Sequence, residues 1–161
     1  MFRKKLLSLP LLALLAVSTA FAASPAATPE LSAKLVDGNG MASTAPTSIV
    51  FTIASGSPNL SACPSTSPAN CASGYTLVDT TTGITIANPA GTGGAAALSS
   101  TATSYTYTPA GGLYVGTHIF SLVENGFGAS SSAPLTSGAT TASVTNALTT
   151  LNPPVFSGVV N

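Results

Sequence analysis

The stretch that decides the fold is Gly111–Gly126, GGLYVGTHIFSLVENG. A glycine turn leads into residues whose side chains alternate between the two faces of a β-strand. One face would carry His118, Phe120 and Leu122, and the other would carry Ile119 and Val123. The stretch ends in Asn-Gly, which is the strongest short hairpin signal in a sequence. We therefore expect the central strand of a β-sandwich, followed by a hairpin turn.

Shorter segments with strand-like alternation lie before and after this stretch, separated by glycine, proline and polar turns. They span residues 31–36, 48–54, 75–78, 84–86 and 103–108, with a weaker pattern over 141–151 and a proline-containing edge strand or loop over 130–136. No helix of three or more turns is indicated. Seven or eight short strands predict an all-β sandwich or small barrel. The expected core is Ile49, Phe51, Ile53, Leu77, Ile84, Ile86, Tyr105, Phe120 and Leu122.

The N-terminus has the pattern of a secretory signal peptide. Arg3-Lys4-Lys5 precedes the apolar run Leu6–Val17, and Ala20-Phe21-Ala22 follows with small residues two apart. A transmembrane anchor is the alternative, but the run contains a serine and a proline and is short for a bilayer span. We expect cleavage after residue 22 or 23, no membrane span thereafter, and a secreted, cell-surface or periplasmic protein. The predicted organisation is a signal peptide at 1–23, a leader at 24–29, a sandwich at 30–136 and a C-terminal extension at 137–161.

Charge is scarce in this chain. Charged residues make up 5% of it, against about 25% in an ordinary globular domain. Without the signal peptide, one basic residue faces four acidic ones, a net charge of −3; the residues are Lys34, Glu30, Asp37, Asp79 and Glu124. No basic patch exists to neutralise phosphates, which excludes nucleic acid as an expected partner.

Cys63 and Cys71 are the two cysteines, and they enclose PSTSPAN. Two cysteines this close in an exported protein favour a disulfide. Free thiols and a metal or redox site are the alternatives, but a metal site would need further cysteine or histidine ligands. The one histidine is distant in sequence. We expect no metal and no cofactor.

Several motifs near the central stretch resemble those of bacterial immunoglobulin-like domains. The motifs are Tyr107-Thr108-Pro109-Ala110, then Leu113, Gly116-Thr117-His118 and Glu124-Asn125-Gly126. The resemblance implies a seven-stranded Ig-like β-sandwich of the kind found in surface adhesins and extracellular fibres. This chain departs from the family in lacking tryptophan and in its long segment Gly56–Ser73. The family fixes no biochemical activity.

Catalytic chemistry has few candidates here. His118, a serine, and Asp79 or Glu124 are the residue types of a nucleophilic triad. No serine lies in a Gly-x-Ser-x-Gly sequence, and the resemblance places His118 where an aromatic residue usually packs, so we interpret it as structural. Asp37-Gly38-Asn39-Gly40 is similar to the start of a calcium loop, but the remaining ligands are missing, which favours a plain turn.

The C-terminus carries an apolar alternating segment after Pro153-Pro154. Its apolar residues are Val155, Phe156, Val159 and Val160. Such a segment could add a strand to its own sheet or to that of a neighbour. We therefore expect a non-enzymatic extracellular structural or adhesive protein, such as a fibre subunit that assembles through strand edges. Its partners would be further copies of itself, or a surface glycan or protein. The alternative is a monomeric module that binds carbohydrate or protein through Gly56–Ser73; an enzyme is the least favoured hypothesis.

Overall fold

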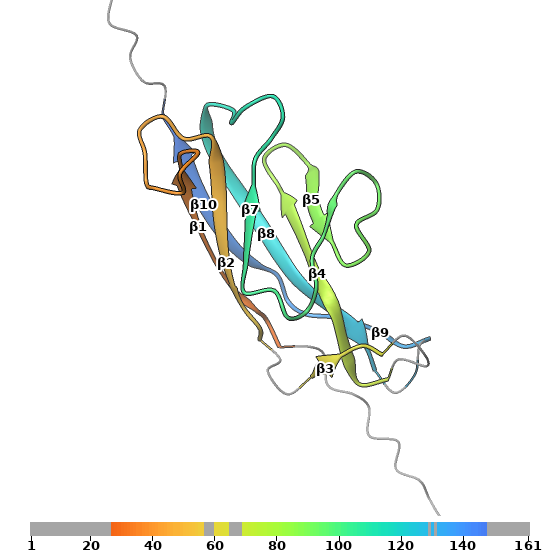
Figure 1. The fold of residues 1–161 in the computed structure, drawn as a ribbon. Coiled ribbons are helices and arrows are strands. Elements are labelled where there is room, and N and C mark those ends of the chain that lie inside the picture. Colours follow the sequence, from red (N-terminus) through yellow and green to blue (C-terminus); the bar gives the residue numbers. More distant parts are fainter. Residues whose placement is uncertain (1–26, 57–59, 65–68, 129, 131, 148–161) are drawn as a thin grey trace, which may run out of the picture.

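The computed structural model describes residues 27–56, 60–64, 69–128, 130 and 132–147. These residues form strands and loops in two sheets, without a helix (Figure 1). The expected all-β sandwich is thereby confirmed. The predicted signal peptide and the predicted assembly residues Val155, Phe156, Val159 and Val160 lie outside the described residues.

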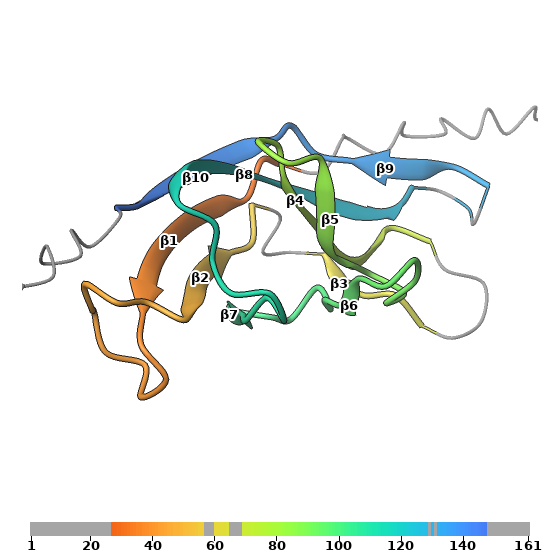
Figure 2. The ribbon, with the colours of Figure 1, turned by 90° about the horizontal axis from the view of Figure 1, so that it is seen from above.

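The two sheets form two layers, which Figure 2 shows from above. The smaller sheet has the order β1 (Glu30–Val36), β2 (Ser48–Ala54), β7 (Ser104–Tyr107). The larger sheet has the order β10 (Thr140–Asn146), β8 (Gly116–Phe127), β4 (Cys71–Asp79), β5 (Ile84–Asn88), β6 (Ala96–Ala97). Two further short strands join it: β3 (Ser61–Ala62) pairs with β4, and β9 (Pro134–Thr136) pairs with β8. All pairs are antiparallel except β3–β4 and β5–β6.

Strand β8 lies inside the larger sheet, with strands on both sides, as the alternation predicts. It pairs with β10 and β4 on its two sides, and with β9 beyond the end of β10. The predicted inner residues His118, Phe120 and Leu122 are buried, whereas Ile119 on the outer face is 46% exposed. The expectation of a central strand with one buried face is confirmed.

The predicted hairpin at Asn125-Gly126 is wrong, because β8 continues through it to Phe127. The Asn125 amide donates to Thr76 Oγ1 at 2.9 Å across the β4–β8 pair. A Cβ on Gly126 would overlap the backbone oxygen of Cys71. Because Gly126 has no side chain, β8 and β4 can approach each other closely at this point. The chain reverses only after β8, where the Gly128 amide donates to the Ala133 carbonyl at 2.7 Å.

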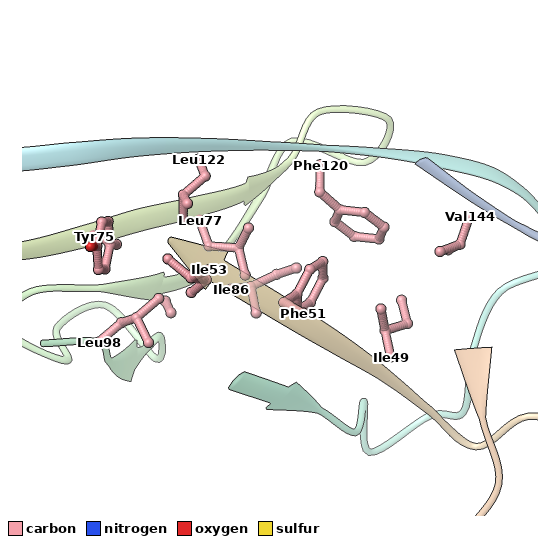
Figure 3. Packing of buried hydrophobic residues seen from close by; sticks show 11 residues of the cluster. Ile49, Phe51, Ile53, Tyr75, Leu77, Ile86, Leu98, Phe120, Leu122 and Val144 are labelled. Atoms are coloured by element: carbon pink, nitrogen blue, oxygen red, sulfur yellow. The ribbon is translucent and has the colours of Figure 1, made fainter. Parts of the chain in front are cut away.

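The core lies between the two sheets (Figure 3). Phe51 and Phe120 meet edge to face at its centre, with ring centroids 4.9 Å apart. Of the predicted core, Ile84 is 45% exposed and Tyr105 is only partly buried. Ile84 begins β5 directly after a turn, at the end of the sandwich, so the opposite sheet does not cover it. Tyr75, fully buried, belongs to the core and was not predicted.

The described chain enters and leaves the sandwich at opposite ends. Thr28 lies against Gly138, whose neighbour Ser137 bonds to Glu124 of β8. The end of β10, at Asn146, lies opposite Gly116, about 27 Å away along β8 for eight residues of strand. Figure 1 shows this separation, with the first described residues at one end and the end of β10 at the other. We call these the entry end and the exit end.

Two boundaries differ from the sequence interpretation. Strand β10 pairs with β8 as an edge strand of the larger sheet, although it lies beyond the predicted sandwich limit of residue 136. Strand β4 begins at Cys71, so the segment Gly56–Ser73 is not a loop throughout. The sandwich thus extends at least to Asn146, and the chain between β2 and β4 is shorter than expected.

Candidate functional site

The predicted disulfide is present. Cys63 and Cys71 are bonded, with their Cα atoms 4.8 Å apart, within the usual range for a disulfide. The bond ties the residue after β3 to the first residue of β4, next to the parallel pair of Ser61 with Cys71. It anchors the segment proposed as a binding loop, of which residues 57–59 and 65–68 lie outside the described residues.

His118 and Asp79 form a buried pair near the exit end. Nδ1 of His118 lies 2.7 Å from Oδ2 of Asp79, and both side chains are about nine-tenths buried. Asp79 ends β4, and its Oδ1 accepts the backbone amides of Thr81 and Thr82 at 2.9 and 3.3 Å in the turn that follows. The imidazole also stacks near the rings of Tyr114 and Phe120, with ring centroids 6.4 and 6.2 Å away. The turn orients the Asp79 carboxylate, and the neighbouring aromatic rings orient the His118 imidazole.

The pKa of Asp79 is below its ordinary value. Burial by itself would raise this pKa, but hydrogen bonds from His118, Thr82 and the amides of Thr81 and Thr82 outweigh burial. All of these bonds favour the charged carboxylate. Asp79 is therefore an ionised acceptor in the folded protein.

Asp79 and His118 are placed like the acid and the imidazole of a nucleophilic triad. In a triad the acid accepts from one imidazole nitrogen while the other nitrogen accepts the hydroxyl proton. No hydroxyl of the described residues forms a hydrogen bond with His118. The cavity beside it, lined by residues such as Tyr107 and Leu113, has a volume of about 20 Å³, which admits about one water molecule. Asp79 and Glu124 were both candidates from the sequence, and Asp79 is the acid that contacts His118 in the structure.

Glu124 lies on the same face of β8, toward the entry end. It is 1% exposed; its Oε1 accepts from Ser55 Oγ at 3.1 Å, and its Oε2 has no hydrogen-bond partner among the described residues. Burial raises the pKa of the nearby Tyr75 hydroxyl, a hydrogen bond with Ser55 opposes the rise, and the negative charge of Glu124 adds to it. Only the alternation along β8 could have indicated that this carboxylate points inward.

Asp37 does not form a calcium loop. Its Oδ1 accepts the amides of Asn39 and Met41 at 2.8 and 3.0 Å, which is the geometry of an aspartate-led turn. Among the described residues, no three histidine, cysteine or acidic side chains gather closely enough to hold a metal ion.

Strand edges are the other candidate site. Cα atoms of β1 and β10 approach within 8 Å, whereas a strand placed between them would hold them about 9.6 Å apart. That side of the sandwich therefore has no room for another strand. On the opposite side β7 ends the smaller sheet, and among the described residues its backbone is paired only with β2.

Two surface hollows lie elsewhere on the described chain. One, of about 230 Å³, is lined by residues that include Leu35, Pro46 and Ala147 at the exit end. The other, of about 150 Å³, lies over β1 and β2 beside Leu31 and Thr52. Both are smaller than the clefts that usually hold small-molecule ligands.

A scan of protein-family models, a search of curated proteins and a search of solved structures each returned no match to this chain. Within the described residues, no helix has the length and apolar character needed to cross a membrane.

Proposed function

We propose that this protein is a non-enzymatic extracellular structural or adhesive subunit that assembles with further copies of itself through strand edges. The observation that carries the proposal is the placement of the described chain: it enters the sandwich at one end and leaves it at the other, while no other described strand pairs with the outer edge of β7. Subunits of this kind can be joined end to end, and an unpaired edge can accept a strand from a neighbour.

The sheet arrangement supports an immunoglobulin-like subunit. In the immunoglobulin fold, strands A, B and E lie in one sheet and strands C, F and G in the other. Here β1, β2 and β7 form one sheet, and β4, β8 and β10 belong to the other, in the same chain order. Because the sandwich fold occurs in proteins of many functions, this agreement supports only the architecture that we propose. The function itself is argued from the strand edges and from the two ends of the sandwich.

The composition supports an extracellular site of action. A disulfide persists where the surroundings are oxidising. The hydroxyl-rich surface also includes a hydrogen bond between two threonines on neighbouring strands, Thr117 and Thr145, with their Oγ1 atoms 2.9 Å apart. Such a surface is hydrated with little net charge, which leaves the strand edges without strong electrostatic repulsion.

Deletion of residues 155–161 from the secreted protein tests the proposal. We expect the complete secreted chain to form filaments visible by electron microscopy and the shortened chain to stay monomeric in sizing. The matched control keeps the full length and carries only Asn161→Ser, a polar exchange outside the apolar residues, which should leave filaments intact. Filaments of the shortened chain, or a monomeric complete chain, would refute assembly by the C-terminal segment.

A second function is favoured by one feature, the disulfide-anchored segment between β2 and β4. The Cys63–Cys71 bond restricts this segment at the entry end and reduces the entropy lost on binding a ligand. A monomeric protein that is retained by particular sugars on a glycan array would support this binding module. Retention that survives removal of the segment would contradict it.

A further inference from the structure

We infer that the edge of β7 is the acceptor for residues 155–160 of a second copy of this chain. This inference rests on the proposed function and names the surface through which the assembly would occur. The acceptor is the unpaired backbone of β7, together with the exposed apolar residues near its end at the exit end of the sandwich.

The other strand edges of the described chain are less accessible than the edge of β7. The β1 and β10 edges approach each other too closely to admit a strand between them. In the larger sheet, β6 covers Ala87 and Asn88 of β5 and leaves only the first three residues of that strand open. Within the described chain, strand β7 is unpaired on its outer side along all four of its residues. It is the longest unprotected edge in the described part of the chain.

Strand β7 lacks the residues with which proteins usually protect the edge of a sheet. Charged side chains and prolines on an edge strand block the approach of another strand. Strand β1 carries Lys34, whereas β7 has the sequence SYTY, without charge or proline. An added strand therefore meets no charged side chain and no proline on β7, which is protected only by being short.

Exposed apolar residues lie beside β7. Tyr107 of β7 lines the small cavity beside His118 together with Ile84 and Tyr114, which are 45% and 65% exposed. Val115, next in the chain, is 54% exposed. A strand laid along β7 would cover part of this surface, and burial of apolar area stabilises by about 25 cal/mol per Å².

The chain beyond Ala147 contains a segment whose length and composition suit pairing with β7. Residues 155–160 read VFSGVV, six residues that span about 20 Å as a strand, against about 13 Å for the four residues of β7. Alternation would place Phe156 and Val160 on one face. Residues 148–154 would bridge about 23 Å, and β10 directs the chain out of the exit end. These lengths suit a neighbour placed beyond that end.

Cross-linking with isotope mixing tests the acceptor. A photoreactive phenylalanine analogue at position 156 is incorporated into the secreted chain, and ¹⁴N and ¹⁵N copies are mixed before assembly. We expect cross-links between ¹⁴N and ¹⁵N chains that join position 156 to the peptide containing β7. Cross-links confined to one isotope, or cross-links between chains to β5 or β10, would overturn the inference.

A charge on the acceptor edge supplies an independent measurement. Thr106→Lys places a charge on β7, and Thr52→Lys places the same charge on β2, which has strands on both sides; both threonines are exposed. We expect T106K to reduce filament yield more than tenfold and T52K to change it less than twofold, with equal thermal stability. Equal yields would overturn the β7 assignment. Filaments that need residues 155–161 but ignore T106K would contradict only this inference, whereas a secreted chain that stays monomeric would contradict the proposed function itself.

Discussion

Asp79 combines two tasks, since one carboxylate oxygen holds a turn and the other holds His118. Its lowered pKa means that the unfolded chain takes up the proton first as the pH falls. The stabilising contribution of the carboxylate is therefore complete above the ordinary aspartate pKa of about 3.9 and is lost as the pH falls toward the lower folded pKa.

The first prediction follows from these bonds. Asp79→Asn should lower the free energy of unfolding at pH 7 by about 1–3 kcal/mol, because charge-assisted hydrogen bonds in a buried site are weakened. The difference between the variant and the natural protein should shrink as the pH is lowered from 5 to 2. Urea titrations at several pH values measure it, and a difference that grows on acidification would contradict the assignment.

Glu124 gives the second prediction. Its carboxyl group is buried, and within the described chain one of its oxygens has no hydrogen-bond partner. Glu124→Gln retains an acceptor for Ser55 but places an amide NH2 group, which needs acceptors, where this oxygen lies. A buried donor without an acceptor is costly, so we expect the substitution to lower the free energy of unfolding at pH 7 by about 1–3 kcal/mol. An unchanged or higher stability in the same urea titration would show that the NH2 group finds an acceptor.

At the scale of elements, the pairing of β8 with β4 depends on a glycine. Gly126→Ala would place a methyl group on the backbone oxygen of Cys71, so we expect a loss of more than about 2 kcal/mol from a displaced strand. Gly111→Ala is the matched control, because nothing lies within 4 Å of its added Cβ. Thermal unfolding compares the two, and equal midpoints would show that the strands separate without cost.

The elements themselves follow from alternation with turn residues between them. Strand β2 has the predicted bounds 48–54, because its apolar residues alternate without interruption. Asn125-Gly126 misled the prediction, since the same pair that suits a tight turn also suits a strand that approaches another backbone closely. Ile84 misled it in another way: β-branched character predicts a strand, but not whether the opposite sheet reaches far enough to cover it.

At the scale of the whole molecule, an end-to-end assembly has a definite repeat. The twelve residues of β8 span about 40 Å, and β8 runs between the entry end and the exit end. We expect filaments of the secreted chain to show an axial repeat of about 40–50 Å in electron micrographs, close to the length of β8. A repeat near the width of the sandwich, about 25 Å for five strands, would indicate lateral stacking and contradict the end-to-end arrangement.

The sequence by itself determined the all-β class, the buried face of β8 and the cysteine pair, because alternation and short spacing are local properties of a chain. It also supplied both acids that could partner His118. Only the tertiary structure decided that Asp79 is the partner of His118 and that Glu124 is buried. It also decided that, within the described chain, one oxygen of Glu124 has no hydrogen-bond partner and the outer edge of β7 is unpaired. Those outcomes depend on which strands pair and how far each sheet extends, and contacts between residues distant in sequence set both.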